Sequence, residues 1–172
     1  MKIGRITISD RASTGIYPDR SGPEIERLLR EVFGAEAGFV CALVPDEAGQ
    51  ISAKLREFAD HEQCDLVVTT GGTGISVRDV TPEATRAVLE KEIPGFGELM
   101  RGQTFARIRT AILSRATAGT RGRSLIVNLP GNPSAVAECL ELLAPAIREG
   151  VAHLRGEDPH EAAGGAPAAT KP

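Results

Sequence analysis

Three short apolar segments that alternate with amphipathic segments constrain the fold of this chain most strongly. Residues 2–9, 39–44 and 66–69 are rich in apolar and β-branched side chains, and the last two contain no charged residue. Between them, residues 21–32 and 50–59 carry apolar side chains at helical spacing. Strands that are apolar throughout are typical of a parallel sheet covered on both faces. The pattern therefore predicts an α/β three-layer sandwich with a mostly parallel central sheet flanked by helices.

The second half of the chain predicts more helices and a β-hairpin. Glycines at 119 and 122 indicate the turn of the hairpin, and Pro145 is expected to end one helix and begin another. Ser21 and Thr81 are the expected caps of the helices that they precede. The expected elements are helices at 81–90, 96–106, 134–143 and 145–154 and strands at 111–118 and 124–128, with residues 10–21 as a loop.

Length and composition fit one globular domain with an ordinary core. The chain has 172 residues, of which 41% are hydrophobic and 25% charged, and its formal net charge is −3. Aromatic residues make up only 3%, so the stacked aromatic side chains of a nucleic-acid platform are not available, and no nucleic-acid partner is expected. From Gly156 onward the composition shifts to Ala, Gly and Pro. We therefore predict a domain over residues 1–155 and a disordered tail over 156–172.

The cysteines and the N-terminus indicate a cytoplasmic protein. Cys41, Cys64 and Cys139 are odd in number and form no C-x-x-C pair, so we expect buried small side chains and not disulfides or a zinc site. Arg5 interrupts the first apolar segment, and no signal peptide or membrane-spanning segment is expected.

A glycine loop directly follows the third apolar segment. Residues Gly71, Gly72, Thr73 and Gly74 lie at the predicted carboxyl end of a parallel strand, where open α/β sheets bind ligands. The sequence is neither a P-loop nor a dinucleotide fingerprint, because the spacing differs and no Gly-Lys-Ser/Thr follows. We interpret the loop as a cradle for an anion or a planar ligand, with a plain tight turn as the alternative.

Two aspartates are expected beside this loop. Asp46 follows the second strand and Asp79 follows the glycine loop, so both belong to the same edge of the sheet. Two carboxylates next to a phosphate cradle suit Mg²⁺, which also takes ligands from substrate phosphates. For Asp46 the alternative is a helix cap.

Two further features complete the candidate set. Pro130, Gly131, Asn132 and Pro133 form a rigid loop between a strand and a helix, and Asn132 alternatively caps that helix. Arg115, Arg121 and Arg123 surround the hairpin; arginine suits phosphate, which makes Arg115 a substrate-binding candidate, although solvated charges are the commoner case.

Taken together, the motifs of the chain resemble those of one family. They are Ser9-Asp-Arg-Ala-Ser13, Asp19-Arg-Ser-Gly-Pro23, Pro45-Asp-Glu47, Thr70-Gly-Gly-Thr-Gly74, Arg78-Asp-Val-Thr-Pro-Glu-Ala-Thr85, Pro94-Gly-Phe-Gly-Glu98, Leu113-Ser-Arg115 and Leu129-Pro-Gly-Asn-Pro133. Over about residues 3–155 the set resembles the molybdopterin adenylyltransferases, the bacterial MogA family, which has a MoaB/Mog-type fold similar to the G domain of eukaryotic molybdenum-cofactor proteins.

The resemblance implies an activity and roles. AMP from Mg-ATP would pass to the phosphate of molybdopterin, and pyrophosphate would be released. Asp46 and Asp79 would be the catalytic, Mg²⁺-binding acids, both loops would line the pocket, and Thr104 and Ser114 would lie on the pterin-phosphate side. A homotrimer and a downstream molybdenum-insertion protein are the implied partners.

Two other functions stay open. A molybdopterin-binding carrier or scaffold without transferase activity would use the same fold, but a mere binder has no need of the two acids. An interaction module of a competence-damage-type or cofactor-insertion protein would normally carry further domains.

The shortage of aromatic residues also predicts how the pocket recognises its ligands. A pterin and an adenine are both flat rings, and the chain has five Phe, one Tyr and no Trp. We therefore expect backbone donors of the glycine and proline loops to provide most of the ring recognition. Because the chain is net negative, local arginines, loop N–H groups and Mg²⁺ are expected to bind the anionic substrates.

Overall fold

The computed structural model, which describes residues 1–157, has a six-stranded mixed sheet at its centre. The strand order is β2-β1-β3-β6-β5-β4. The first four strands in that order are parallel, and β5 and β4 run antiparallel to their neighbours. The strands are β1 (Lys2–Ile8), β2 (Gly38–Val44), β3 (Leu66–Thr70), β4 (Lys91–Glu92), β5 (Ala118–Arg121) and β6 (Ser124–Leu129). The predicted fold class, with its β5–β6 hairpin, is confirmed.

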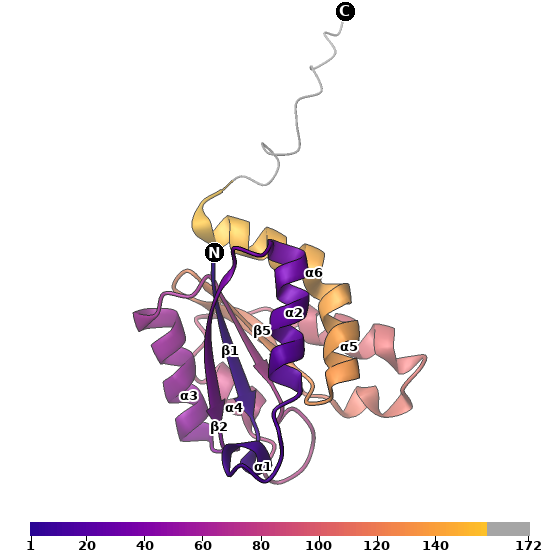
Figure 1. Cartoon of the computed structure of the whole chain (residues 1–172). Coiled ribbons are helices and arrows are strands. Elements are labelled where there is room, and N and C mark those ends of the chain that lie inside the picture. Colours follow the sequence, from indigo (N-terminus) through magenta and orange to yellow (C-terminus); the bar gives the residue numbers. More distant parts are fainter. Residues whose placement is uncertain (158–172) are drawn as a thin grey trace, which may run out of the picture.

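Helices cover both faces of the sheet, as the apolar strands require. The α-helices are α1 (Asp10–Ser13), α2 (Ser21–Phe33), α3 (Ala48–Arg56), α4 (Thr81–Arg86), α5 (Gly95–Phe105) and α6 (Pro133–Arg155). A π-helical turn, η1 (Glu57–His61), follows α3, and a 3-10 helix, η2 (Arg109–Leu113), follows α5. Buried side chains of α2, α5 and α6 pack on one face of the sheet, and those of α3, η1 and α4 pack on the other. Figure 1 shows α2 and α6 together on one side of the strands and α3 on the other.

Successive side chains of β1 and β3 point to opposite faces of the sheet, so each strand contributes to the hydrophobic core on both sides. Ile3 and Leu66 belong to the cluster beneath α2 and α6, whereas Ile6 and Val67 belong to the cluster beneath α3 and α4. All four side chains are fully buried. Burial of apolar surface on both faces stabilises the sheet by roughly 25 cal/mol per Å².

Cys41 does not have the buried position that we predicted. Cys64 and Cys139 are buried, but Cys41 is exposed on β2, which is an edge strand whose residues are mostly exposed or half-buried. The apolar run at 39–44 has the composition of a central strand. In the fold, however, β2 is the edge of the sheet and pairs only with β1, which leaves Cys41 exposed.

The prediction that Pro145 separates two helices is wrong. The helix α6 runs unbroken from Pro133 to Arg155 with Pro145 inside it. A proline in a helix interior removes one backbone hydrogen bond. Here the apolar stripe continues across the proline, and Leu140, Leu143 and Ile147 are all buried. Their packing on the sheet outweighs the lost bond.

The strand predicted at 111–118 is also wrong. Residues Arg109–Leu113 form η2, and the sheet pairing begins only at Ala118. Ile112 is 62% exposed and Leu113 is 46% exposed, so this apolar run is not a buried strand. Gly119 is correspondingly a strand residue and not a turn residue, while Gly122 makes the turn with φ +51°. The helix predicted at 81–90 ends early, at Arg86.

The segment 10–21, predicted to be a loop, begins with the short helix α1. Ser9 caps it by accepting a hydrogen bond from the N–H of Ala12. The next helix, α2, is not capped by Ser21. Instead Asp19 Oδ1 accepts from the N–H of Gly22 at 2.9 Å, and the Ser21 hydroxyl donates to the carbonyl of Gly131 at 2.8 Å.

A buried arginine holds Asp19 in place. Arg5, on β1, is only 9% exposed, and its guanidinium donates to Asp19 Oδ2 at 2.8 Å and to Glu26 Oε1 at 2.8 Å. Thr7 donates to the same Asp19 oxygen at 2.8 Å. A buried charge of this kind is stable only when it is paired and hydrogen-bonded. The network ties the start of α2, and the loop before it, to β1.

Within the part of the chain that the structure describes, no helix combines the length and the apolar composition needed to cross a bilayer. Gly156, in the left-handed region with φ +75°, ends α6. Of the predicted disordered tail, residues 158–172 lie outside the described residues.

Candidate active site

The glycine loop turns at the carboxyl end of β3, between β1 and β6. Gly71 and Gly72 have φ +99° and +62°, which only glycine adopts readily. A Cβ on Gly71 would lie 2.2 Å from the carbonyl oxygen of Ile8, so the loop passes directly against the end of β1. The Gly71 N–H donates to the carbonyl of Leu129 at 3.3 Å, which connects the loop to β6.

The start of α4 holds the loop from the other side. The Thr81 hydroxyl donates to the carbonyl of Gly71 at 2.9 Å, and its N–H donates to the carbonyl of Gly72 at 3.1 Å. Thr81 was predicted to cap α4, but the structure uses its hydroxyl on the loop and no side chain caps the helix. The loop therefore has a fixed shape.

Three successive N–H groups of this loop have no acceptor in the protein. Among residues 1–157, the N–H groups of Gly72, Thr73 and Gly74 make no hydrogen bond to a protein atom. Unpaired N–H groups in a rigid glycine turn form a concave site for an anion. The geometry leaves these donors available to a ligand, and the anion cradle stays a prediction.

A carboxylate faces each end of the cradle. Asp46 Oδ1 lies 2.9 Å from the position that a Cβ on Gly72 would take, and Asp79 Oδ2 lies 2.9 Å from the corresponding position at Gly74. The glycines at 72 and 74 therefore leave room for the two acids. Asp79 is itself held by the N–H of Ser76, which donates to Oδ2 at 2.7 Å.

Asp46 does not cap α3; it pairs with Asp10, which sequence reasoning missed. The N–H of Asp10 donates to Asp46 Oδ2 at 2.8 Å, and the N–H of Asp46 donates to Asp10 Oδ1 at 3.0 Å. Arg78 binds Asp10 through two hydrogen bonds of 2.9 and 2.8 Å. The signal was present in the sequence, because Asp10 follows β1 just as Asp46 follows β2, and the two strands are adjacent.

The two acids of this pair titrate differently. Burial raises the pKa of Asp46, the Asp10 N–H opposes that shift, and the negative charges of Asp10 and Asp79 add to it. The hydrogen bonds from Arg78 lower the pKa of Asp10. Asp46 is thus the acid of the pair with the higher affinity for a proton.

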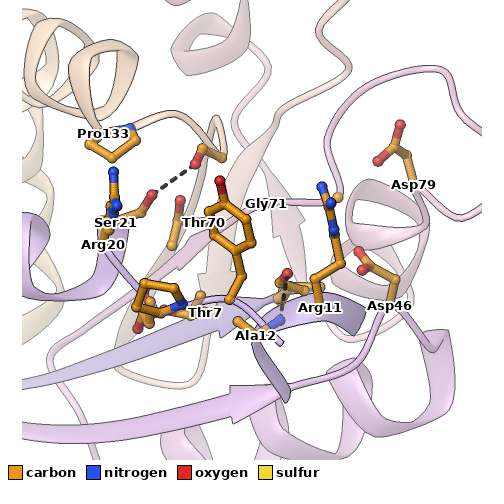
Figure 2. Close-up of a pocket in the computed structure, with 17 residues that line it drawn as sticks. Thr7, Arg11, Ala12, Arg20, Ser21, Asp46, Thr70, Gly71, Asp79 and Pro133 are labelled. Carbon is orange, nitrogen blue, oxygen red and sulfur yellow. Dashed lines mark hydrogen bonds between the residues drawn. The ribbon is translucent and has the colours of Figure 1, made fainter. Parts of the chain in front are cut away.

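A cavity of 490 Å³ opens on one side of the glycine loop (Figure 2). Asp46, Asp79, Gly71 and Gly72 line it. Arg11 and Arg20 also line it, and within the described residues neither forms an ion pair with a carboxylate. The remaining lining residues are Thr7, Ile8, Ser9, Ala12, Tyr17, Pro18, Asp19, Ser21, Thr70, Gly131 and Pro133.

A second cavity, of 340 Å³, opens on the other side of the loop. It contains Thr73 and Gly74 of the cradle together with Thr104, Ser114 and Pro130. Apolar side chains, including Met100, Ile108 and Leu113, form much of the rest of its wall. The residues of the cradle are thus divided between the two cavities. A larger hollow of 690 Å³ between α2 and α6 contains none of the predicted site residues.

The proline loop contributes to both cavities. Pro130 lines the second cavity, and Gly131 and Pro133 line the first. A Cβ on Gly131 would lie 3.3 Å from the Cα of Gly71, so the two loops are in backbone contact. Asn132 lines neither cavity; its Oδ1 accepts from the N–H of Ser134 at 2.9 Å, which makes it the cap of α6, as in the alternative interpretation.

Arg115 lies outside the residues that line the two cavities. Its guanidinium donates to the carbonyl of Gly74 at 2.7 Å and to the carbonyl of Asp79 at 2.6 Å, and it pairs with Glu83. It therefore spans the loop 74–79 that carries Asp79. Arg121 and Arg123 pair with Asp60 and Asp65 and are far along the sheet from the loop.

The donor set fits Mg²⁺. Two carboxylates flank an anion cradle, and the described residues contain no group of three or more Asp, Glu, His or Cys that could hold a metal ion by themselves. Mg²⁺ binds through one or two carboxylates and completes its shell with substrate phosphate oxygens and water. Asp46 and Asp79 are the residues that would hold it, and the bound ion would neutralise phosphate charge.

These observations define a class: an α/β protein with two ligand cavities that share one anion-binding loop. Residues 4–149 match a family model described as a probable molybdopterin binding domain. The chain is 52% identical over 145 residues to a molybdopterin adenylyltransferase of Helicobacter pylori, covering 84% of this chain and 82% of the relative. It is 44% identical over 153 residues to the molybdopterin adenylyltransferase of Escherichia coli K12, covering 89% and 78%.

A solved structure agrees in fold. The molybdopterin biosynthesis enzyme MoaB of Thermus thermophilus superposes with a TM-score of 0.83 at 41% identity, covering 91% of this chain and 97% of that one. The chain belongs to the molybdopterin adenylyltransferase (MogA/MoaB) family, as its motifs predicted.

Proposed function

We propose that this chain is a molybdopterin adenylyltransferase, which joins the AMP moiety of ATP to the phosphate of molybdopterin in molybdenum cofactor biosynthesis. The observation that carries the proposal is the division of one anion cradle between two cavities. A transferase of this kind must bring two anionic substrates together at one point, and Gly72 to Gly74 provide donors on both sides of that point.

The cavities suggest which substrate binds where. Thr104 and Ser114, the residues implied for the pterin phosphate, both line the second cavity, and the free arginines and both aspartates line the first. We assign molybdopterin to the second cavity and ATP to the first. An oxygen of the pterin phosphate attacks the α-phosphorus of ATP, the bond to the β-phosphate oxygen breaks, and pyrophosphate leaves with the electron pair.

The residues contribute by position and charge. The cradle N–H groups bind the phosphate oxygens next to the new bond, and Arg11 and Arg20 attract the leaving pyrophosphate. No general base is needed, because the attacking phosphate oxygen is already ionised near neutral pH. Asp46 and Asp79 are the residues that would hold Mg²⁺, which would supply positive charge to the nucleotide phosphates.

The direct test is to incubate the purified protein with molybdopterin and Mg-ATP and to measure adenylylated molybdopterin and pyrophosphate together. We expect both products in equal amounts, and none without molybdopterin or without Mg²⁺. Molybdopterin binding without either product would instead support the carrier function. The homotrimer, the molybdenum-insertion partner and the cytoplasmic location stay predictions.

Activity is expected to fall in acid as Asp46 takes up a proton. Burial raises the pKa of Asp46, so the acid limb of kcat/KM for ATP is expected above the ordinary aspartate range. The positive charge of Arg78 lowers the pKa of both Asp46 and Asp10. Replacing Arg78 by Met therefore moves the acid limb to higher pH. The measurement is the pH profile of pyrophosphate release for both proteins.

A matched control is Arg86→Met, which removes another exposed arginine of an ion pair, the one with Glu92. Its acid limb is expected to match that of the unmodified protein. An Arg78→Met profile that also matches would show that protonation of Asp46 does not limit the reaction at low pH.

A further inference from the structure

Tyr17 lies in the first cavity and has no place in the function as described so far. It is the one tyrosine of a chain without tryptophan, and it is 52% exposed where it lines the cavity that holds Asp46 and Gly72. The guanidinium of Arg11 lies 5.2 Å from the centre of its ring. The residue is therefore accessible from the cavity that it lines.

The loop that carries Tyr17 is fixed at both ends. The N–H of Tyr17 donates to the carbonyl of Arg11 at 3.1 Å, which ties the residue to α1. Two residues later, Asp19 is held by the buried Arg5 and by Thr7. Because the backbone on both sides of Tyr17 is fixed, the loop itself loses little conformational freedom when a ligand stacks on the ring.

We propose that Tyr17 stacks on the adenine base of ATP and is the base-recognition element of the nucleotide cavity. The proposal rests on the proposed function, because it places the base in the cavity where the two aspartates and the unpaired arginines would hold the phosphates. Arg11 lies over the ring at cation–π distance, so one face of the ring already has a partner of the opposite polarity.

The other cavity does not offer such a surface. Its wall is mostly apolar and hydroxyl-bearing, with Arg101 and Glu138 as its charged residues, and none of residues 1–157 contributes an aromatic side chain to it. The prediction that backbone donors provide most of the ring recognition is therefore kept for the pterin, and the proposal adds a side-chain partner for the adenine. Stacking of a base on an aromatic side chain increases the affinity for the nucleotide by roughly 5- to 150-fold.

The first test uses Tyr17 as its own probe. With no tryptophan and one tyrosine, the intrinsic fluorescence of the protein comes from this ring. We expect Mg-ATP and AMP to quench it, and inorganic tripolyphosphate, which has no base, to leave it nearly unchanged. Free tyrosine with the same amount of adenine nucleotide corrects for absorption of light by the base. Absence of quenching at saturating ATP would overturn the proposal.

The second test separates stacking from folding. We expect Tyr17→Leu to raise KM for ATP about tenfold while kcat and KM for molybdopterin change less than twofold, and Tyr17→Phe to restore the KM. Ile16→Ser is the matched control, since Ile16 is 72% exposed in the same loop and does not line the cavity. A Tyr17→Leu variant with unchanged KM for ATP, or with raised KM for molybdopterin, would contradict the assignment.

The two proposals fail in different ways. If the unmodified protein forms no adenylylated molybdopterin, the transferase function is wrong, yet quenching by ATP and AMP would still support base stacking at Tyr17. If transfer occurs and Tyr17→Leu is kinetically normal, the function holds and the stacking proposal is wrong.

Discussion

Asp79→Asn is expected to lower kcat for adenylyl transfer by about 10²–10³-fold, on the scale of losing one preorganised electrostatic group from an active site. Asparagine has nearly the same shape, and its carbonyl oxygen can still accept from the N–H of Ser76. What is lost is the negative charge opposite Gly74. Because Asp79 lines the nucleotide cavity and not the other one, molybdopterin binding is expected to stay close to normal.

The measurement is single-turnover formation of adenylylated molybdopterin, with molybdopterin binding determined separately. Asp79→Ala is expected to abolish transfer, because it removes the charge and also leaves the Ser76 N–H without its acceptor. Asp60→Asn is the matched control, since Asp60 pairs with Arg121 away from both cavities. Turnover of Asp79→Asn at the normal rate would remove Asp79 from the mechanism.

Gly71→Ala is expected to destabilise the fold by about 4 kcal/mol or more, which places it among the rare severe substitutions. The φ of +99° disfavours any side chain, and the new Cβ would stand 2.2 Å from the carbonyl oxygen of Ile8. That oxygen belongs to the backbone of a central strand, so it cannot move aside as a flexible side chain would.

Gly122→Ala separates the cost of the positive φ from the cost of the collision with the carbonyl oxygen of Ile8. Gly122 also has a positive φ, of +51°, but nothing lies within 4 Å of the position that its Cβ would take. We expect Gly122→Ala to lower the free energy of unfolding by about 1–2 kcal/mol. The melting temperatures of the two variants measure the difference, since each kcal/mol lowers Tm by about 2–4 °C in a chain of this length. Equal losses at both positions would show that the collision with Ile8 is relieved at little cost.

The central strands could be predicted from the sequence because each buried strand is a continuous run of apolar and β-branched residues. Leu66 to Val68 can only be a covered strand, and the glycines that follow can only turn. The errors arose where tertiary contacts compete with local preference. Pro145 normally breaks a helix, but the buried stripe on both sides of it holds α6 together.

The candidate site was predictable to the extent that strand ends determine it. Asp46, Asp79 and the glycine loop meet because parallel strands end at one edge. The uses of Ser21 and Thr81 were not predictable, since each hydroxyl donates to a loop rather than to its own helix. Arg115 was assigned from its charge alone, and only the folded chain shows that it spans the loop before Asp79.

The backbone contact between Gly71 and Gly131 has a consequence for how the protein loses activity on heating. These glycines follow β3 and β6, which are hydrogen-bonded neighbours, and Asp10 and Asp46 follow β1 and β2 on the same edge. The width of the site is thus set by the interstrand spacing of about 4.8 Å. The part of the site at the strand ends is therefore expected to be lost together with the sheet, in one cooperative transition, when the protein is heated.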